Sequence, residues 1–242
     1  GVNIICLNYK GLINLQQTLR KLRKIIKDNK IDIIHSHLAP ASFYVNLARP
    51  KYVPQLHTLH IAYSTDFETR PLLKFLERKL FFNKPYCNLA MLSEFTQADF
   101  LQAVKFKGKS FVLNNFIEDA FFENEPKAYD GTAAAGLRMI AVGNFREQKN
   151  YGYLLDIFKQ LKGYNIHLDI YGGGDTEKYK QDIEENKLSI TVKGPSKHIY
   201  QVIADYDLFI MPSTNEGFPL SVFEAMAAGL PLMLSDIEPL RA

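Results

Sequence analysis

The chain has 242 residues, 47% hydrophobic and 23% charged, a composition that excludes a disordered segment and allows one or two globular domains. No run reaches the roughly 18 uninterrupted apolar residues of a membrane span, and no signal-peptide pattern opens the chain. Residues 1–122 carry 17 Lys and Arg against 9 Asp and Glu, whereas residues 123–242 carry 12 Lys and Arg against 17 Asp and Glu. The basic first half therefore suits an anionic membrane surface or an anionic substrate. No nucleic-acid-binding motif accompanies it.

The first half alternates predicted strands and helices. Residues 2–7 form the first predicted strand, and Leu and Ile then recur at helical spacing over 12–26 with Lys and Arg between them. This spacing predicts a basic amphipathic helix, which either packs on a sheet as an ordinary surface helix or also touches lipid headgroups. Further strands are predicted over 31–35, 52–59, 88–92 and 110–113.

A linker separates this half from a second alternating series. Residues 123–136 have no periodic apolar face and contain Pro and Gly, which is typical of a linker. The second series predicts strands over 137–143, 167–171, 190–193, 207–212 and 232–234. Alternating strands and helices favour parallel sheets with right-handed crossovers. We therefore expect two α/β domains, residues 1–122 and 137–242, joined by the linker.

A short buried helix is predicted near the end of the chain, because Pro219 suits a first helical turn and Gly229 suits a stop. Glu224 falls inside this helix, although a buried Glu is costly without a hydrogen-bond partner. Glu216 falls on the loop at the carboxyl end of the preceding strand, where open α/β sheets bind ligands. The backbone N–H groups at the helix start can hold an anion. Either the site binds a ligand with hydroxyls and phosphate, or Glu216 caps the helix and Glu224 reaches solvent.

Residues 216–231 read E-G-F-P-x-S-x-x-E-A-M-A-x-G-x-P, with the two Glu in E-x7-E spacing, and this pattern resembles glycosyltransferase family 4. The resemblance covers nearly all of the chain. It implies the GT-B fold, in which two Rossmann-like parallel-sheet domains face each other across a cleft. It also implies retaining transfer from a UDP- or GDP-sugar, with no cofactor and no metal. Compared with the family pattern, we expect the N-terminal strand with its Gly-rich loop and the C-terminal helices to be missing.

The resemblance gives roles to the residues around the helix start. Glu224 is expected to bind the ribose hydroxyls, and Glu216 the hydroxyls of the transferred sugar. Lys149 and the backbone of the helix start are expected to stabilise the leaving diphosphate by electrostatic catalysis. The backbone positions are Gly217, Phe218, Pro219 and Leu220.

Residues 143–150, G-N-F-R-E-Q-K-N, resemble the family pattern G-R-L-x-x-x-K-N/G, whose Arg and Lys bind the diphosphate. Lys149 matches the Lys. Asn144 stands where the Arg is expected, and whether Arg146 replaces it stays open. Three glycines complete the expected nucleotide site. Gly172 and Gly174 resemble the family's Y-G-x-G turn that borders the nucleotide, although a plain loop is an equal alternative. Gly194 resembles the strand-end glycine beside the base.

Four histidines, His35, His37, His57 and His60, close two strands of the first half. A zinc site is disfavoured, because no neighbouring Cys or paired carboxylate completes it. Residues 53–60 resemble the family's V-P-x-x-x-T-x-H, whose last His meets the donor sugar, and this role goes to His60. Residues 205–207 spell the D-x-D of metal-dependent transferases, but they lie at the entry of a strand, where a capping role is favoured.

The resemblance, together with the basic first half, implies a retaining glycosyltransferase that extends a lipid-linked glycan in cell-envelope or extracellular polysaccharide synthesis. A non-catalytic nucleotide-sugar-binding module, or an inactive fragment of such an enzyme, is the alternative. Cys6 and Cys87 fall in apolar runs and are expected to be buried thiols in a reducing compartment. We therefore expect a cytoplasmic protein, peripheral on the inner face of the membrane.

Overall fold

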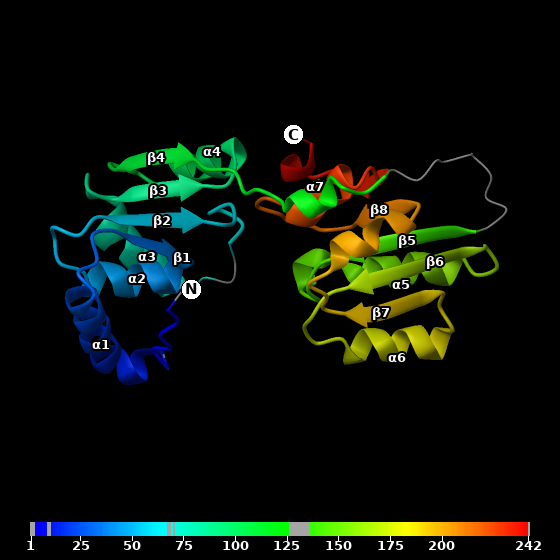
Figure 1. Cartoon of the computed structure of the whole chain (residues 1–242), viewed down its shortest axis with the longest axis horizontal. Helices are drawn as coiled ribbons and strands as arrows, with labels where there is room; N and C mark the ends of the chain where they lie inside the picture. The colour runs from blue at the N-terminus through cyan, green and yellow to red at the C-terminus, as the bar shows by residue number, and fades with distance from the viewer. Residues whose placement is uncertain (1–2, 9–10, 67–68, 70, 126–135, 242) are drawn as a thin grey trace. The chain divides into compact units, whose positions relative to one another are not determined.

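The computed structural model describes residues 3–8, 11–66, 69, 71–125 and 136–241, which form two compact units (Figure 1). Unit 1 is Gly1–Asn114 and unit 2 is Asn115–Ala242. Each unit contains one parallel β-sheet covered by helices, so the predicted α/β class with two parallel sheets is confirmed.

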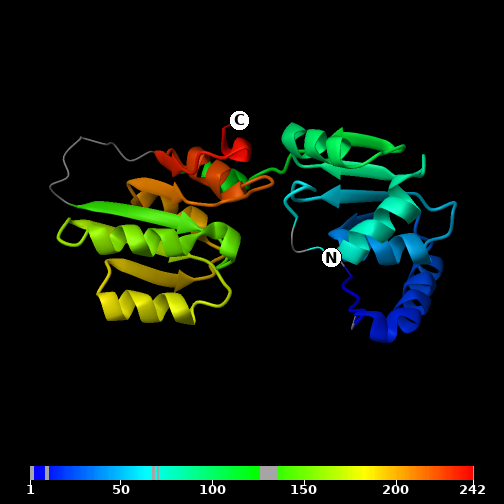
Figure 2. The same cartoon turned by 180° about the vertical axis from the view of Figure 1, so that it is seen from behind.

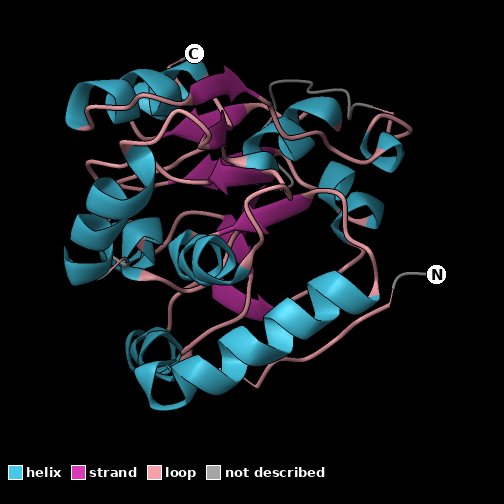
Figure 3. Cartoon of the chain, turned by 90° about the vertical axis from the view of Figure 1, so that its left-hand side faces the viewer, coloured by secondary structure: helices cyan, strands magenta, loops and turns pink. Residues whose placement is uncertain are grey.

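The sheet of unit 1 has four parallel strands in the order β1-β2-β3-β4. The strands are β1 (Ile34–His37), β2 (Gln55–Leu59), β3 (Asn88–Met91) and β4 (Lys109–Val112). The helices are η1 (Gly11–Asn14), α1 (Leu15–Asp28), α2 (Ala39–Ala48), α3 (Pro71–Glu77) with its π-helical continuation η2 (Arg78–Phe82), and α4 (Glu94–Ala103). Parallel neighbours require crossover connections, and Figure 3 shows helices flanking the strands.

Two apolar clusters hold the helices of unit 1 in place. One contains Phe82 and Phe100, which meet edge to face with ring centroids 5.1 Å apart. The other contains Phe43 and Phe81 and receives the leucines of α1. The apolar stripe of the predicted basic helix is therefore covered by protein, while its Lys and Arg side chains face solvent.

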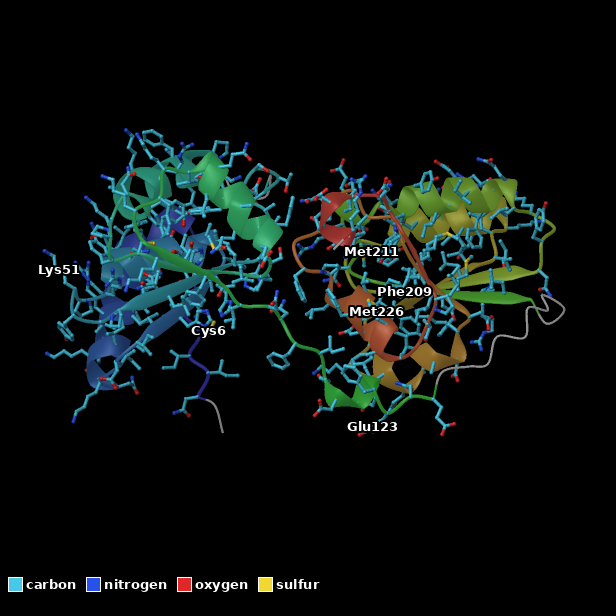
Figure 4. All side chains as sticks on the ribbon, turned by 90° about the horizontal axis from the view of Figure 1, so that it is seen from above. Cys6, Lys51, Glu123, Phe209, Met211 and Met226 are labelled. Carbon is cyan, nitrogen blue, oxygen red and sulfur yellow. The ribbon has the colours of Figure 1, made fainter. Side chains whose placement is uncertain are left out.

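Two sequence predictions for unit 1 are wrong. The sequence predicts a strand over residues 2–7, but the described residues 3–8 form none, and Ile4 is 92% exposed. A strand needs a neighbour for its backbone hydrogen bonds, and no described strand pairs with this segment. Cys6, expected to be buried, is exposed on the same segment (Figure 4). Cys87 is partly buried, and burial raises the pKa of its thiol to about 12.

The sheet of unit 2 has five parallel strands in the order β7-β6-β5-β8-β9. The strands are β5 (Leu137–Val142), β6 (Ile166–Tyr171), β7 (Ile190–Gly194), β8 (Leu208–Met211) and β9 (Leu232–Leu234). The helices are η3 (Asp119–Phe121), η5 (Glu147–Lys149), α5 (Tyr151–Gln160), α6 (Glu177–Asn186), η6 (Ile199–Gln201), η7 (Ile203–Asp205), α7 (Leu220–Ala227) and η8 (Glu238–Leu240). Because β5 is central, the strand order reverses between β5 and β8, which is where open α/β sheets bind ligands.

The sheet of unit 2 is buried on both faces. The helices α5 and α6 lie on one face (Figure 2), and α7 packs on the other together with η3, η6 and η7. Phe209 and Met211 of β8 point to the α7 side (Figure 4), whereas Leu208 and Ile210 pack on the α5 side. Burial on both faces explains why β8 reads as a continuous apolar run.

The boundary between the units falls after Asn114, earlier than the expected end of the first domain at residue 122. The physical reason is Phe121, which is 5% exposed and packs in the core of unit 2 with Ile203 and Phe209. Residues 126–135 of the expected linker 123–136 lie outside the described residues.

Candidate functional site

A buried ion pair lies at the carboxyl edge of the unit 2 sheet, between the loops that follow β5 and β8. Lys149 Nζ donates a hydrogen bond to Glu216 Oε1 at 2.7 Å, and the two side chains are 14% and 8% exposed. Two further bonds join the same loops: Thr214 N donates to Gln148 O at 2.8 Å, and Asn150 Nδ2 donates to Pro212 O at 3.2 Å. The two loops that carry the pair are therefore fastened together by one backbone and one side-chain hydrogen bond.

The loop that carries Lys149 has a fixed shape. Asn150 adopts a left-handed conformation with φ of 52°, which Asn tolerates better than most residues, and it joins η5 directly to α5. The Tyr151 hydroxyl donates to Gly143 O at 2.9 Å, and burial raises the pKa of this phenol. Sequence reasoning missed Tyr151, because a single Tyr at a helix start carries no distinguishing signal. Arg146 lies exposed at the start of η5, on the same loop.

The predicted helix near the end of the chain is α7. It begins at Leu220, and no side chain caps its start, so Glu216 pairs with Lys149 instead of capping the helix. Gly217 and Pro219 are buried between Glu216 and the helix. The Phe218 ring stacks on Phe223 of α7, with centroids 4.6 Å apart and an interplanar angle of 16°. This stacking fixes the loop that leads into the helix.

Glu224 lies on α7 and is half-buried. Burial raises the pKa of its carboxyl group, and the charge of Glu118 raises it further. Glu118 precedes η3, which contacts α7. A carboxyl group in this position gains from a ligand that donates hydrogen bonds to it, which is the chemistry expected of a ribose diol.

The predicted glycines lie side by side with Asn144. Asn144 Oδ1 accepts a hydrogen bond from Gly173 N at 2.9 Å, and Phe145 N donates to Gly173 O at 2.7 Å. A Cβ on Gly172 would lie 1.9 Å from Gly143 O, so only glycine fits there. Gly172 N donates to Gly194 O at 3.0 Å. The turns after β5, β6 and β7 are thus fastened together, and Gly174 follows in the same turn with φ of 115°.

His60 belongs to unit 1, where it follows β2. Its Nε2 lies 2.8 Å from Nδ1 of His37, at the end of β1. The structure therefore brings Lys149, Glu216 and the glycine turns together in unit 2, and His60 together with another histidine in unit 1. His57 is buried and bonds to the Ser36 carbonyl through Nδ1 at 3.1 Å, which is a structural contact.

Neither the four histidines of unit 1 nor the D-x-D at residues 205–207 forms a metal site within the described ranges. No group of three or more His, Cys, Asp and Glu side chains in this part of the chain is arranged to hold a metal ion. Of the D-x-D carboxylates, Asp207 accepts a hydrogen bond from Arg138 N at 2.8 Å, at the entry to β5. This is the structural role that its position at a strand entry predicts. The expectation of metal-free chemistry stays a prediction.

Two family models match the chain, and together they cover nearly all of it. Residues 2–121 match the model described as Glycosyltransferase Family 4, and residues 133–242 match the model described as Glycosyl transferases group 1.

Curated relatives extend this similarity. The chain is 29% identical to the putative glycosyltransferase EpsF of Bacillus subtilis, over 93% of this chain and 63% of the relative. It is 26% identical to the UDP-Gal:alpha-D-GlcNAc-diphosphoundecaprenol alpha-1,3-galactosyltransferase of Escherichia coli, over 98% of this chain and 65% of the relative. The chain thus spans slightly less than two thirds of these relatives.

Solved structures show the same fold. Anabaena Alr3699/HepE in complex with UDP-glucose has a TM-score of 0.78 at 17% identity, covering 96% of this chain and 66% of that protein. TarM has a TM-score of 0.73 at 21% identity, covering 93% of this chain and 45% of that protein. These similarities show that the two units have the GT-B fold.

Proposed function

Since the chain belongs to the family 4 glycosyltransferases of the GT-B fold, we propose that it transfers a sugar from a UDP- or GDP-sugar to a glycan acceptor with retention of configuration. The observation that carries this proposal is the buried Lys149–Glu216 pair at the strand-order reversal of unit 2. A cation and a carboxylate held together beside glycine turns offer partners for a diphosphate and for sugar hydroxyls at one place.

In this proposal each side chain has a separate task. Glu224 accepts hydrogen bonds from the ribose, and Glu216 accepts them from the transferred sugar. Lys149 and the backbone around Gly217–Leu220 stabilise the charge that develops on the leaving diphosphate. Without ligand Glu216 neutralises Lys149, so donor binding requires Lys149 to share its N–H groups between the carboxylate and a phosphate oxygen. The family resemblance implies that His60 contacts the donor sugar. No cofactor and no metal takes part.

We further propose that the acceptor is a lipid-linked glycan of envelope or extracellular polysaccharide synthesis. The name of the Escherichia coli relative states a diphosphoundecaprenol-linked acceptor, and another relative, WbnH of Escherichia coli, is named an O-antigen biosynthesis glycosyltransferase. The basic side chains of α1 are exposed and supply a surface for anionic headgroups. None of the helices within the described ranges has the length and apolar character needed to cross a bilayer. We propose that this membrane contact is peripheral.

A second candidate function is nucleotide-sugar binding without transfer. The observation that favours it is Asn144, which replaces an expected cation and whose side-chain oxygen is used by Gly173 N. With Lys149 as the matching cation of this motif, stabilisation of the leaving group is weaker than in the family pattern. Donor binding without turnover would favour this candidate.

The experiment that tests the site is calorimetric titration with UDP and with GDP. We expect one nucleotide to bind at about micromolar Kd, roughly −8 kcal/mol, and Glu224→Ala to abolish that binding. Glu184→Ala on α6 is the matched control, because Glu184 is an exposed helical carboxylate of the same unit. Turnover of a UDP- or GDP-sugar then separates the transferase from the binding module. If neither nucleotide binds to folded protein, both candidate functions fail.

A further inference from the structure

The carboxyl ends of β1 and β2 carry three imidazole rings, of which the middle one, His37, contacts the other two. His37 Nδ1 lies 2.8 Å from His60 Nε2, and the ring centroids are 5.1 Å apart. The His35 ring lies against His37 with centroids 4.2 Å apart. The 2.8 Å separation is a hydrogen-bond distance, so one of the two nitrogens carries a proton and the other accepts it.

A polar network fixes the two strand ends beneath these rings. His35 Nε2 forms a 2.7 Å hydrogen bond with Thr58 Oγ1. Thr58 is the β2 residue that lies opposite His37 in the parallel pairing of β1 and β2. On the opposite face Gln55 Nε2 donates to Ser36 Oγ at 2.8 Å, and both side chains are at most 5% exposed. Rigid strands place side chains more accurately than loops do, so this network defines where the His37 ring can lie.

The backbone after His37 is held in an uncommon conformation. Leu38 has φ of 68° and ψ of 146°, a region that glycine occupies easily and that is unfavourable for residues with a side chain. Its side chain is 62% exposed, so burial of Leu38 does not compensate for this cost. The strained residue ends β1 at His37 and turns the chain directly into α2. Strain of this kind persists where the surrounding structure determines a functional geometry.

We propose that His37 is a positioning residue for His60, holding the His60 ring in one orientation and one tautomer through the Nδ1–Nε2 hydrogen bond. This inference rests on the proposed function, in which His60 contacts the donor sugar. His37 itself need not touch the donor. A fixed second partner is the usual means by which the tautomer of a functional histidine is set.

The surroundings of His60 disfavour the charged form of its ring. Burial lowers the pKa of His60, and the charges of His37 and then His35 lower it further. In a neutral His60 ring the role of Nδ1 depends on the role of Nε2 in this bond. If His37 Nδ1 donates the hydrogen bond, His60 carries its proton on Nδ1 and offers a donor. If His60 Nε2 donates it, His60 Nδ1 is an acceptor. His37 therefore decides whether His60 presents a donor or an acceptor to a sugar hydroxyl.

Long-range ¹⁵N–¹H correlation spectra of the imidazole rings test the proposal directly. In the wild-type protein we expect His60 to be one neutral tautomer at neutral pH. His37→Phe keeps a ring of similar size but removes the bond, and should give a mixture of both tautomers. His198→Phe is the control, because His198 bonds to Tyr200 outside this cluster and its loss leaves the His37–His60 bond intact, so the single tautomer should persist. His37→Asn, whose amide can bond in place of Nδ1, should restore it in part.

Turnover of a panel of UDP- and GDP-hexoses supplies the second readout. We expect His37→Phe to lower kcat about tenfold with little change in the donor KM, because positioning acts at the reacting centre, and His37→Asn to recover part of the loss. A single His60 tautomer in His37→Phe, with circular dichroism showing a folded protein, would overturn the proposal whatever the kinetics. If the wild-type protein turns over no donor, the proposed function fails, and the tautomer spectra alone decide the role of His37.

Discussion

Replacing Lys149 by Met tests whether the candidate site is built around a buried charge pair. Met keeps most of the apolar stem but removes the ammonium group, which leaves the Glu216 carboxylate buried without its partner. The two side chains are 14% and 8% exposed, so solvent screens the pair little. Breaking a buried pair of this kind costs about 3–5 kcal/mol, most of it from the uncompensated charge.

The double variant distinguishes this reasoning from a loss of packing. In Lys149→Met with Glu216→Gln no unpaired charge remains, so we expect most of the lost stability to return and the coupling in the double-mutant cycle to be large. Lys159→Met is the control: Lys159 pairs with Asp182 at 2.9 Å but lies at the surface, so its removal should cost much less.

The assay is urea denaturation of the protein monitored by circular dichroism, because the protein contains no Trp whose fluorescence could report unfolding. Whichever of UDP and GDP binds should protect the wild-type protein but not Lys149→Met. If the two single variants cost little and their effects simply add, Lys149 and Glu216 are not coupled, and the interpretation of the site as a shared charge pair is refuted.

Three further predictions concern charge elsewhere in the chain. Asn144→Arg should raise the affinity for the nucleotide that binds, UDP or GDP, severalfold in calorimetry by adding a cation beside the diphosphate. Unchanged or weaker binding would show that the loss of the Asn144–Gly173 hydrogen bond outweighs the added charge. Burial, and secondarily Asp66, raises the pKa of Glu77 to about 8 from 4.5, so the free energy of unfolding should fall by up to about 1.4 kcal/mol per pH unit between pH 4.5 and about 8. Glu77→Gln should flatten that slope in urea titrations, and an unchanged slope would exclude Glu77 as its source. Lys24→Glu with Lys27→Glu on α1 should reduce sedimentation with anionic liposomes at low salt, whereas equal sedimentation would remove α1 from the membrane contact.

The parts that the sequence predicts well are those with local signals. The alternation of apolar runs and amphipathic helices predicts both parallel sheets, because each strand carries its own apolar pattern. The Pro219 and Gly229 signals bracket the observed helix Leu220–Ala227. Lys149 and Glu216 could be selected separately by their motifs.

The parts that the sequence does not predict depend on distant partners. Lys149 and Glu216 are 67 residues apart, and nothing local shows that they pair. Phe121 joins the core of unit 2 through contacts with residues far along the chain, which moves the boundary between the units. Residues 2–7 have the composition of a strand, yet the described part of this segment has no neighbouring strand to pair with. Asn144 is a missing cation in the motif but a hydrogen-bond acceptor in the structure.

The central place of β5 also determines the order in which the site can form during synthesis. Lys149 follows β5, whereas Glu216 follows β8. The two strands pair through residues that are far apart in the sequence, such as Met139 and Leu208. A nascent chain that has emerged only as far as β7 therefore presents one edge of β5 unpaired and has no partner for Lys149. Contacts between such distant residues form slowly. We therefore expect the ion pair to be among the last features of unit 2 to assemble, and the unpaired backbone edge of β5 to be the surface that a chaperone would need to shield until then.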